Sequence, residues 1–346
     1  MKGQQHLTIM HVLFSRGFAG SERSTAESCN QQCQQHKVIL VIRKGHRKNG
    51  ISIIDKLDNR VEVVEIDHFW FTRWHLNKLI NHYQADVIHC HLRRATRIVG
   101  KISPKAATIS TLHIRANGQY FNKMDGLICN ARWQIAELKD NYAGKIHKAH
   151  NSLTPHKTLS TDKITELREQ LAPQPQTYLI GAVGRFHASK AWDTLIAAFK
   201  QLTNEQKQQC KLVFFGSGRL EQELKKLAEN EAQIEFVGFK NNIKDYYQCL
   251  DLLVCPSRFE PLPRVILEAM DAGTPVIASD QGGCKELIED YGGLLFPVDN
   301  VPALTEQLSC CISRKPARHK PDLTAHYIEN ANQAIVNFYL NCIQAS

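Results

Sequence analysis

The chain has 346 residues, of which 43% are hydrophobic, 22% charged and 8% aromatic. This composition is ordinary for a globular protein of about two domains and excludes an intrinsically disordered chain. The net charge of +9 is uneven, because residues 1–170 hold 26 basic and 14 acidic residues, whereas residues 171–346 hold 17 and 20. A basic half beside a near-neutral half predicts two domains that meet different partners.

Targeting and redox signals point to the cytoplasm. The sequence has no uninterrupted apolar run near 20 residues and no pattern of a secretory leader at its start, so neither a transmembrane helix nor secretion is expected. Its eleven cysteines are an odd number without a C-x-x-C pair, which argues against a disulfide framework or a zinc ribbon. We expect reduced, partly buried thiols.

The first half of the chain alternates strands with helices. Strands are predicted over residues 7–14, 37–42, 61–66, 87–91, 108–113 and 125–130. Helical stretches lie between several of them, for example over residues 74–82. This alternation predicts βαβ units and a parallel sheet.

A proline-bearing segment near residues 154–175 then interrupts the pattern, as an interdomain connection does. The alternation restarts with strands at 178–183, 211–215, 234–237, 250–254 and 275–278, and helices at 192–202, 220–228 and 264–272. The predicted fold class is therefore α/β, with two doubly wound, Rossmann-like domains. We place the domains at residues 1–165 and 166–323, and expect a final helix within residues 324–346 to pack back towards the N-terminal domain.

Two loops that follow strands have the composition of anion-binding sites. Residues 17–22 are mostly small and precede a helix, so their backbone could approach a phosphate, although a simple tight turn explains them equally well. In residues 184–190, Arg185 and Lys190 bracket a short loop and could converge on a diphosphate. Two solvent-facing basic residues are the alternative for this second loop.

A third loop, residues 257–268, carries two carboxylates. Glu260 precedes a helix for which Pro263 fits the first position, and Glu268 lies in the second turn. Glu268 stands in an apolar helical run, where a carboxylate is costly to bury without polar partners. One carboxylate could therefore meet a sugar hydroxyl at the mouth of the helix while the other reaches a ribose deeper in.

Together these features resemble the retaining glycosyltransferases of family 4, which have the two-domain GT-B fold with a central cleft. Glu260 and Glu268 reproduce the E-x7-E motif of that family, and residues 183–190 are similar to its Arg…Lys diphosphate clamp. Residues 215–218 and 236–239 are similar to its nucleotide-side loops, and residues 19–23 to its Gly-Gly-x-Glu loop. The resemblance covers almost the whole chain and is strongest over residues 178–298.

The resemblance implies a role for each matching residue. Arg185 and Lys190 would bind the donor diphosphate, Glu268 the ribose, and Glu260 the donor sugar. On the same basis, Phe239 would border the base, His113 would lie by the sugar and acceptor, and Gly20 would approach the phosphate from the N-terminal domain. That domain would bind the acceptor and the C-terminal domain the nucleotide sugar. The family needs neither a metal nor a cofactor for catalysis, so none is expected.

Two positions depart from the pattern of the family. Pro263 stands where the family usually has Gly, which removes one N–H donor and leaves the identity of the donor sugar open. Asn151 is followed by Ser152 where Asn-Gly is usual. His89 and His91 match histidine-bearing strand ends of the family. We expect them to serve packing or acceptor-side hydrogen bonds rather than one metal, on the reasoning that alternate strand residues point to opposite faces.

The acceptor is expected to be an anionic glycan or glycolipid. Residues 68–75 mix aromatic and basic side chains, which suits contact with the inner face of a membrane. Core packing at a helix start explains the aromatics as well and is the interpretation we favour from sequence. With the basic first half, the implied function is sugar transfer, from a UDP-linked donor, in lipopolysaccharide core or other cell-surface polysaccharide synthesis.

Other functions fit parts of the sequence. A nucleotide-sugar epimerase or phosphorylase shares the GT-B fold, and a silent sugar-nucleotide sensor would bind the donor without transfer. A nucleic-acid-binding protein fits the basic charge, but no known nucleic-acid module is visible and the two glutamates would be unexplained. We therefore expect no nucleic-acid partner.

Overall fold

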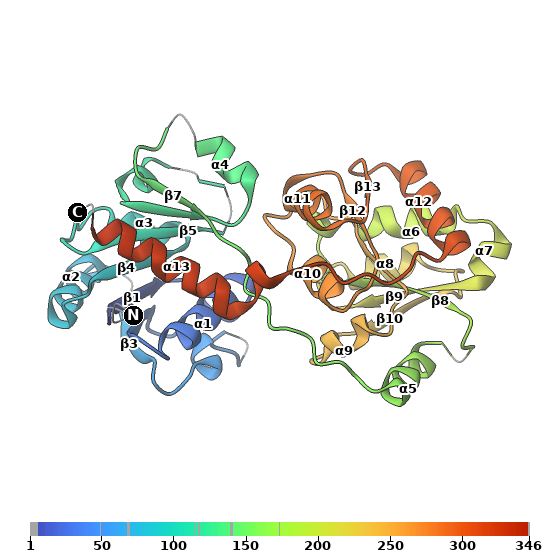
Figure 1. Ribbon diagram of the computed structural model, residues 1–346, viewed down its shortest axis with the longest axis horizontal. Coiled ribbons are helices and arrows are strands. Elements are labelled where there is room, and N and C mark those ends of the chain that lie inside the picture. The colour runs from blue at the N-terminus through green and yellow to red at the C-terminus, as the bar shows by residue number, and fades with distance from the viewer. Residues whose placement is uncertain are drawn as a thin grey trace. The chain divides into compact units, whose positions relative to one another are not determined.

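The computed structural model describes residues 6–48, 50–67, 70–113, 115–116, 118–138, 141–172 and 174–344. The chain divides into two compact units (Figure 1), the first formed by Met1–Ser152 and Thr324–Ser346 and the second by Leu153–Leu323. The expected boundary after residue 165 is too late. The segment after residue 152 already belongs to the second unit, because His156 bonds to Asp271 through its ring and its backbone, and the N–H of Leu159 donates to Gln248.

The first unit is built on a parallel seven-stranded sheet with the strand order β3-β2-β1-β4-β5-β6-β7. Its strands are β1 Thr8–Leu13, β2 Lys37–Arg43, β3 Glu62–Ile66, β4 Val87–His91, β5 Ala107–Leu112, β6 Gly126–Cys129 and β7 Lys145–Lys148. The order reverses between β1 and β4. In open parallel sheets the carboxyl ends of strands at such a reversal form the usual ligand-binding crevice.

Helices cover both faces of this sheet. They are α1 Gly20–Gln32, α2 Thr72–Tyr83, α3 Leu92–Val99, α4 Arg132–Leu138 and α13 Ile328–Ile343, with short 3-10 turns η1 Ile53–Lys56, η2 Gln119–Lys123 and η4 Thr324–His326. Figure 1 shows α13 crossing the first unit beside α1, with which it is in contact. Buried side chains of α13, among them Phe338 and Tyr339, share a core with Ile9, Val87 and Ile109 of the sheet.

The second unit contains a parallel six-stranded sheet with the order β10-β9-β8-β11-β12-β13. Its strands are β8 Tyr178–Val183, β9 Cys210–Phe215, β10 Ile234–Gly238, β11 Leu252–Cys255, β12 Val276–Ser279 and β13 Leu294–Phe296. The order reverses between β8 and β11, so the loops after these two strands are the expected binding loops. The predicted fold class, two doubly wound α/β domains, is confirmed.

The helices of the second unit are α5 Thr161–Leu171, α6 Trp192–Lys200, α7 Asn204–Gln209, α8 Glu221–Leu227, α9 Ile243–Tyr247, α10 Arg264–Asp271, α11 Gly282–Tyr291 and α12 Val301–Arg314, with the turn η3 Ala188–Lys190. One hydrophobic core of this unit packs Trp192, Phe199, Phe214 and Leu308 around the central strands. Rigid central strands of this kind hold the loops at their carboxyl ends in place.

Two further observations concern membrane-spanning helices and cysteines. Among the described residues, no helix combines the length and apolarity needed to cross a membrane. All eleven cysteines are free, and each is buried except Cys310, which is partly exposed.

Candidate functional site

A pocket of about 190 Å³ lies at the carboxyl ends of β8, β9 and β10. Arg185 and Phe239, which the sequence predicts as diphosphate and base contacts, both line it. Phe239 is 71% exposed, so apolar surface is available to a ligand here. The structure gives the Arg185 side chain no hydrogen-bond partner among the described residues, which leaves its guanidinium group available to an anion.

Glycines bring the three loops of this pocket into direct contact. The N–H of Gly184 donates to the carbonyl of Phe215, and the N–H of Gly216 donates to the carbonyl of Gly238. A Cβ on Gly216 would lie 2.0 Å from the carbonyl oxygen of Gly184, so no side chain fits there. Gly216 has a φ of +149°, which also disfavours other residues. The glycine backbone therefore forms part of the pocket lining, which lets a ligand approach the strand ends closely.

Lys190 and Glu260 form an ion pair across the point where the strand order reverses. Lys190 ends the turn after β8, Glu260 lies in the loop after β11, and the Nζ of the lysine contacts Oε1 of the glutamate. Their side chains are 15% and 16% exposed. Burial by itself lowers the pKa of Lys190, but attraction and hydrogen bonding to Glu260, together with the nearby Cys255 and Cys284, outweigh it and the pKa is raised. Lys190 is therefore a fixed positive charge at neutral pH.

Arg258, which sequence reasoning did not single out, holds these two loops together. Its guanidinium group donates to the carbonyl of Ala188 at 2.6 Å and forms ion pairs with Asp193 at 2.7 Å and Asp299 at 2.8 Å. Its backbone N–H donates to the carbonyl of Ser189. Because Arg258 is fully occupied by these contacts, it positions the turn that carries Lys190. Only the three-dimensional contacts distinguish it from the other basic residues of the loops.

Gly283 brings the start of α11 against the loop of Glu260. Its N–H donates to the carbonyl of Glu260 at 3.0 Å, and a Cβ at this position would lie 2.1 Å from the carbonyl oxygen of Pro261. Sequence reasoning missed this residue, although the Gly-Gly pair at a predicted strand end is a signal of close backbone approach.

Glu268 is buried within α10, with 3% of its surface exposed. Its Oε2 accepts a hydrogen bond of 3.1 Å from the hydroxyl of Tyr247, a partner that the sequence did not reveal. Glu268 does not line the 190 Å³ pocket. Pro263 is also placed differently from the prediction, because it immediately precedes α10 instead of occupying the first helical position.

The loop after β1 in the first unit is organised by Glu22. This buried carboxylate accepts hydrogen bonds from the N–H of Ala19 at 3.0 Å and from the hydroxyls of Ser15 and Ser21. Gly20, the first residue of α1, is exposed, and a Cβ there would meet nothing within 4 Å. Glu22 therefore shapes the loop, while Gly20 presents open backbone at a helix start.

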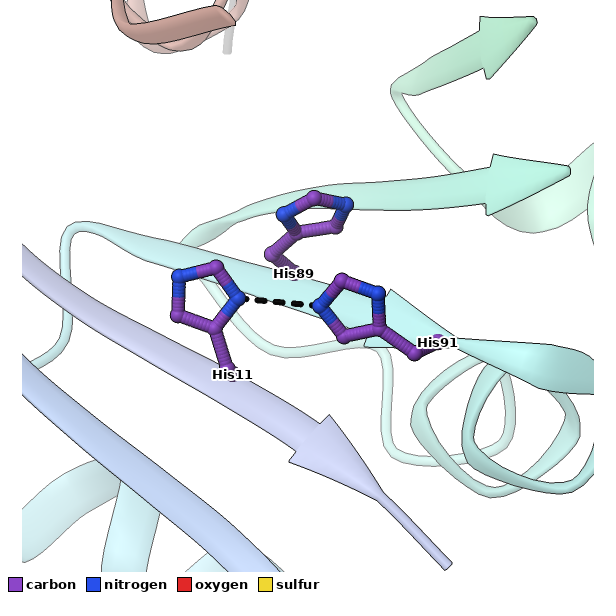
Figure 2. A group of neighbouring side chains, drawn as sticks. All are labelled: His11, His89 and His91. Carbon is purple, nitrogen blue, oxygen red and sulfur yellow. Dashed lines mark hydrogen bonds between the residues drawn. The ribbon is translucent and has the colours of Figure 1, made fainter. Parts of the chain in front are cut away.

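Four histidines gather where the strand order of the first sheet reverses. Figure 2 shows the rings of His11 from β1 and of His89 and His91 from β4 on one side of the strands. The prediction that His89 and His91 point to opposite faces is wrong, because residues two apart on a strand share a face. Nδ1 of His11 lies 2.9 Å from Nε2 of His91, and Nδ1 of His91 lies 3.3 Å from Nε2 of His113.

Burial keeps all four rings neutral. It lowers the pKa of His11 to about 4, against an opposing hydrogen bond to Gln32, and that of His113 to about 4, against the attraction of Glu22. It also lowers the pKa of His89 and His91, and the neighbouring histidines add to the effect. His113, the predicted residue by the sugar and acceptor, therefore belongs to a connected set of neutral imidazoles.

Among the described residues, one group has the chemistry and spacing to hold a metal ion, and it consists of His11, His89 and His91. One ring nitrogen from each of them lies within 4.8 Å of the others. The facing nitrogens of His11 and His91 are, however, hydrogen-bonded to each other. Both nitrogens of His89 are also engaged, by Thr111 and Tyr339 at 2.6 Å each. The arrangement is that of a hydrogen-bonded core rather than of ligands aimed at one ion.

The aromatic residues near the start of α2 are exposed, so the core packing favoured from sequence is wrong for them. Trp70 is 93% exposed, Phe71 69% and Trp74 60%. Lys78 lies over the ring of Trp74, with 5.6 Å between Nζ and the ring centre, and Arg73 is exposed beside it. We call these five residues the aromatic patch. His68 and Phe69 of the same stretch lie outside the described residues.

Comparison with known proteins finds similarity to glycosyltransferases. Residues 163–333 match the family described as "Glycosyl transferases group 1". A lipopolysaccharide core biosynthesis mannosyltransferase of Rhizobium meliloti is 30% identical over 44% of this chain and 46% of that protein. An α-1,4-N-acetyl-D-galactosaminyltransferase of Campylobacter jejuni, which acts on an undecaprenol-linked glycan, is 24% identical over 98% of this chain and 96% of that protein.

These matches cover different shares of the compared chains. The chain spans less than half the length of three curated relatives that it matches at 30% to 33% identity. Among solved structures, HepE of Anabaena in complex with UDP and glucose superposes with a TM-score of 0.74 and 20% identity over 98% of each chain. This likeness identifies the fold as GT-B.

Proposed function

We propose that this protein is a retaining glycosyltransferase that moves a sugar from a UDP-linked donor to an anionic glycan or glycolipid. The observation that carries the proposal is the pocket at the ends of β8, β9 and β10, which Arg185 and Phe239 line together with Gly184 and Gly216. A cation, an apolar ring and open backbone are the groups that a nucleoside diphosphate requires. The match of residues 163–333 to group 1 glycosyltransferases and the complex of HepE with UDP add support.

Arg185 and Lys190 carry the charge of the departing diphosphate in this account. An arginine fork binds two phosphate oxygens at once, and a lysine supplies a compact positive charge. Lys190 is held by Glu260 before the donor binds, so it is already charged and oriented. Fixed cations of this kind stabilise a leaving group without reorganisation. We therefore propose catalysis that requires no metal and no cofactor.

The two glutamates take different parts of the donor. Glu268, oriented by the hydroxyl of Tyr247, accepts hydrogen bonds from the ribose hydroxyls. Glu260, in the loop that Arg258 and Gly283 hold, binds the donor sugar. In the first unit, Gly20 contributes open backbone for a phosphate, and His113 serves the sugar and the acceptor.

We propose that the acceptor attacks the anomeric carbon on the face from which the diphosphate leaves, which retains the configuration of the sugar. The bond from the anomeric carbon to the diphosphate oxygen breaks, and its electron pair leaves with the diphosphate. The acceptor oxygen then bonds to the same face of that carbon, and its proton passes to the departing diphosphate oxygen. Glu260 is engaged by Lys190, which favours this route over a covalent glycosyl-enzyme.

The acceptor is proposed to be presented at a membrane surface. The exposed tryptophans of the aromatic patch, with Arg73 and Lys78, match the side chains that settle at the interface of an anionic bilayer. A lipid-linked glycan of lipopolysaccharide core or another surface polysaccharide fits this placement. The names of the relatives from Rhizobium and Campylobacter support this class of acceptor.

The test is a panel of UDP-, GDP- and ADP-sugars incubated with the whole protein while nucleotide release is recorded. We expect slow release from one UDP-sugar, faster with a glycolipid acceptor, and loss of release in Glu268→Ala. Calorimetry on the same samples separates a protein that awaits its acceptor from one that binds no donor. Failure of every nucleotide sugar to bind at millimolar concentration would overturn the proposal.

A further inference from the structure

The carbonyl of Ile328 provides a starting point from which proton positions in the histidine cluster can be worked out. A backbone carbonyl can only accept a hydrogen bond, and Nδ2 of Asn332 lies 2.9 Å from it. This contact fixes the orientation of the Asn332 amide. Its Oδ1 then faces Nε2 of Gln32 at 3.5 Å, so Gln32 donates from Nε2 and turns its Oε1 the other way.

The orientation of Gln32 determines the proton of His11. Oε1 of Gln32 lies 2.9 Å from Nε2 of His11 and can only accept, so Nε2 of His11 carries the proton. His11 is a neutral ring, because burial lowers its pKa to about 4. Its Nδ1 is therefore bare and accepts from Nε2 of His91 at 2.9 Å.

The proton position on His91 in turn determines that on His113. Because Nε2 of neutral His91 is the donor, its Nδ1 is bare and accepts from Nε2 of His113 at 3.3 Å. Nδ1 of His113 is then left without a proton, and it has no partner among the residues that the structure describes. We propose that Gln32, His11 and His91 form a relay that fixes the tautomer of His113, with the proton on Nε2 and a bare Nδ1.

A separate branch of hydrogen bonds holds His89. The hydroxyl of Tyr339 accepts from Nε2 of Gln32 at 3.4 Å and lies 2.6 Å from Nδ1 of His89. A hydroxyl can donate or accept, so the contact joins Tyr339 to His89 in either direction, and Nε2 of His89 lies 2.6 Å from Oγ1 of Thr111. The ring of His89 is therefore held by contacts that do not include His91 or His113, and it serves as an internal control.

The consequence for chemistry is that His113 can accept a hydrogen bond and cannot donate one from Nδ1. This part of the inference rests on the proposed function, in which His113 serves a sugar or acceptor hydroxyl. Gln32, His11 and His91 are positioning residues, because they act through His113. The tautomer itself follows from the hydrogen bonds of the first unit and does not depend on the reaction.

The test is long-range proton–nitrogen NMR of the whole protein labelled with 15N-histidine, at pH 7.5, with signals assigned by single histidine variants. We expect His113 to show a protonated Nε2 and a bare Nδ1, with the full 15N chemical-shift difference between them at every temperature. Gln32→Leu should reduce this chemical-shift difference as tautomers mix. Tyr339→Phe should alter the signals of His89 and leave His113 fixed.

Three kinds of result would contradict the proposed tautomer of His113. A proton on Nδ1 of His113, or mixed tautomers in the wild type, would overturn the proposal without any variant. A folded Gln32→Leu protein with unchanged His113 signals would do the same. Stoichiometric uptake of added Zn²⁺ that shifts His11, His89 and His91 would replace the relay by a metal site. None of these readouts requires transferase activity, so failure of the proposed function is seen separately in the nucleotide-sugar panel.

Discussion

At the scale of single residues, the partners of a buried polar group decide its charge. Lys190 stays charged inside the second unit because Glu260 is its partner. His11 is fully buried and meets the neutral acceptor Gln32, so burial prevails and the ring stays neutral. The first arrangement suits a site that must attract an anion, and the second suits one that must keep a fixed pattern of protons.

The buried histidines predict that acid destabilises the first unit. The folded pKa of His11 is about 4, below the unfolded value of about 6.5, so the unfolded chain binds more protons between these values. The neutral His11 ring therefore makes its full contribution to the free energy of unfolding above pH 6.5, and this contribution is lost as the pH falls towards 4. For His11 the loss at pH 5 is about 2 kcal/mol.

Urea unfolding of the wild type and His11→Gln at pH 7 and pH 5 checks this expectation. The variant should lose less free energy of unfolding between the two pH values than the wild type does. His89, His91 and His113 face the same cluster and keep titrating in both proteins. Equal losses in the two proteins would show that His11 is not a buried neutral group.

The sequence predicted some of these residues and not others. Arg185 and Phe239 were found because local motifs place them directly after strands, and the structure puts them in one pocket. The relay to His113 could not be predicted, because it joins Gln32 to Asn332, 300 positions apart. Local spacing carries no information on such a contact. The exposure of Trp70 was also misjudged, since an aromatic helix start is usually buried.

At the scale of elements, strands with a strong apolar pattern were predicted almost to the residue, as for β4 and β8. The edge strand β7 was missed, because Lys-Ile-His-Lys has neither the composition nor the length of a buried strand. The edge strand β13 has only three residues. Short edge strands such as these two are defined by the neighbour to which they bond, which local sequence does not specify.

The docking of α13 on the first sheet depends on a glycine. A Cβ on Gly126 of β6 would lie 2.7 Å from the ring of Phe338 and 2.9 Å from Sγ of Cys342. We expect Gly126→Ala to lower the free energy of unfolding by about 1–3 kcal/mol, the usual cost of overpacking a core. Because α13 carries Asn332 and Tyr339, the variant should also loosen the histidine cluster.

Gly20→Ala is the matched control for this measurement, since a Cβ there meets nothing within 4 Å. Thermal melting of both variants should lower the midpoint for Gly126→Ala alone. An unchanged midpoint for Gly126→Ala would mean that α13 does not pack closely on β6.

At the scale of the whole molecule, charge and exposed aromatic surface predict membrane binding. The net charge of +9 attracts the protein to anionic lipid, and the aromatic patch offers side chains for the interface. We expect sedimentation with phosphatidylglycerol vesicles and little with phosphatidylcholine alone. Replacing both Trp70 and Trp74 by serine should weaken vesicle binding by about tenfold or more, a loss of about 1.4 kcal/mol.

Leu227→Ser is the control for this experiment, because Leu227 is a half-exposed apolar residue of α8 outside the patch. It should bind vesicles as the wild type does. Equal binding of the double tryptophan variant and the wild type would assign any membrane contact to charge alone.

The central claim is that the second unit binds a nucleoside diphosphate through Arg185, and calorimetric titration of UDP, GDP and ADP tests it most directly. Arg185→Gln removes the cation from the pocket, and Lys226→Gln removes an exposed positive charge from α8, outside the pocket. We predict that UDP binds the wild type and Lys226→Gln alike, and Arg185→Gln about tenfold to a hundredfold more weakly, as expected for lost charge-assisted hydrogen bonds. Binding of none of the three nucleotides at millimolar concentration, or equal affinity in Arg185→Gln, would contradict the account.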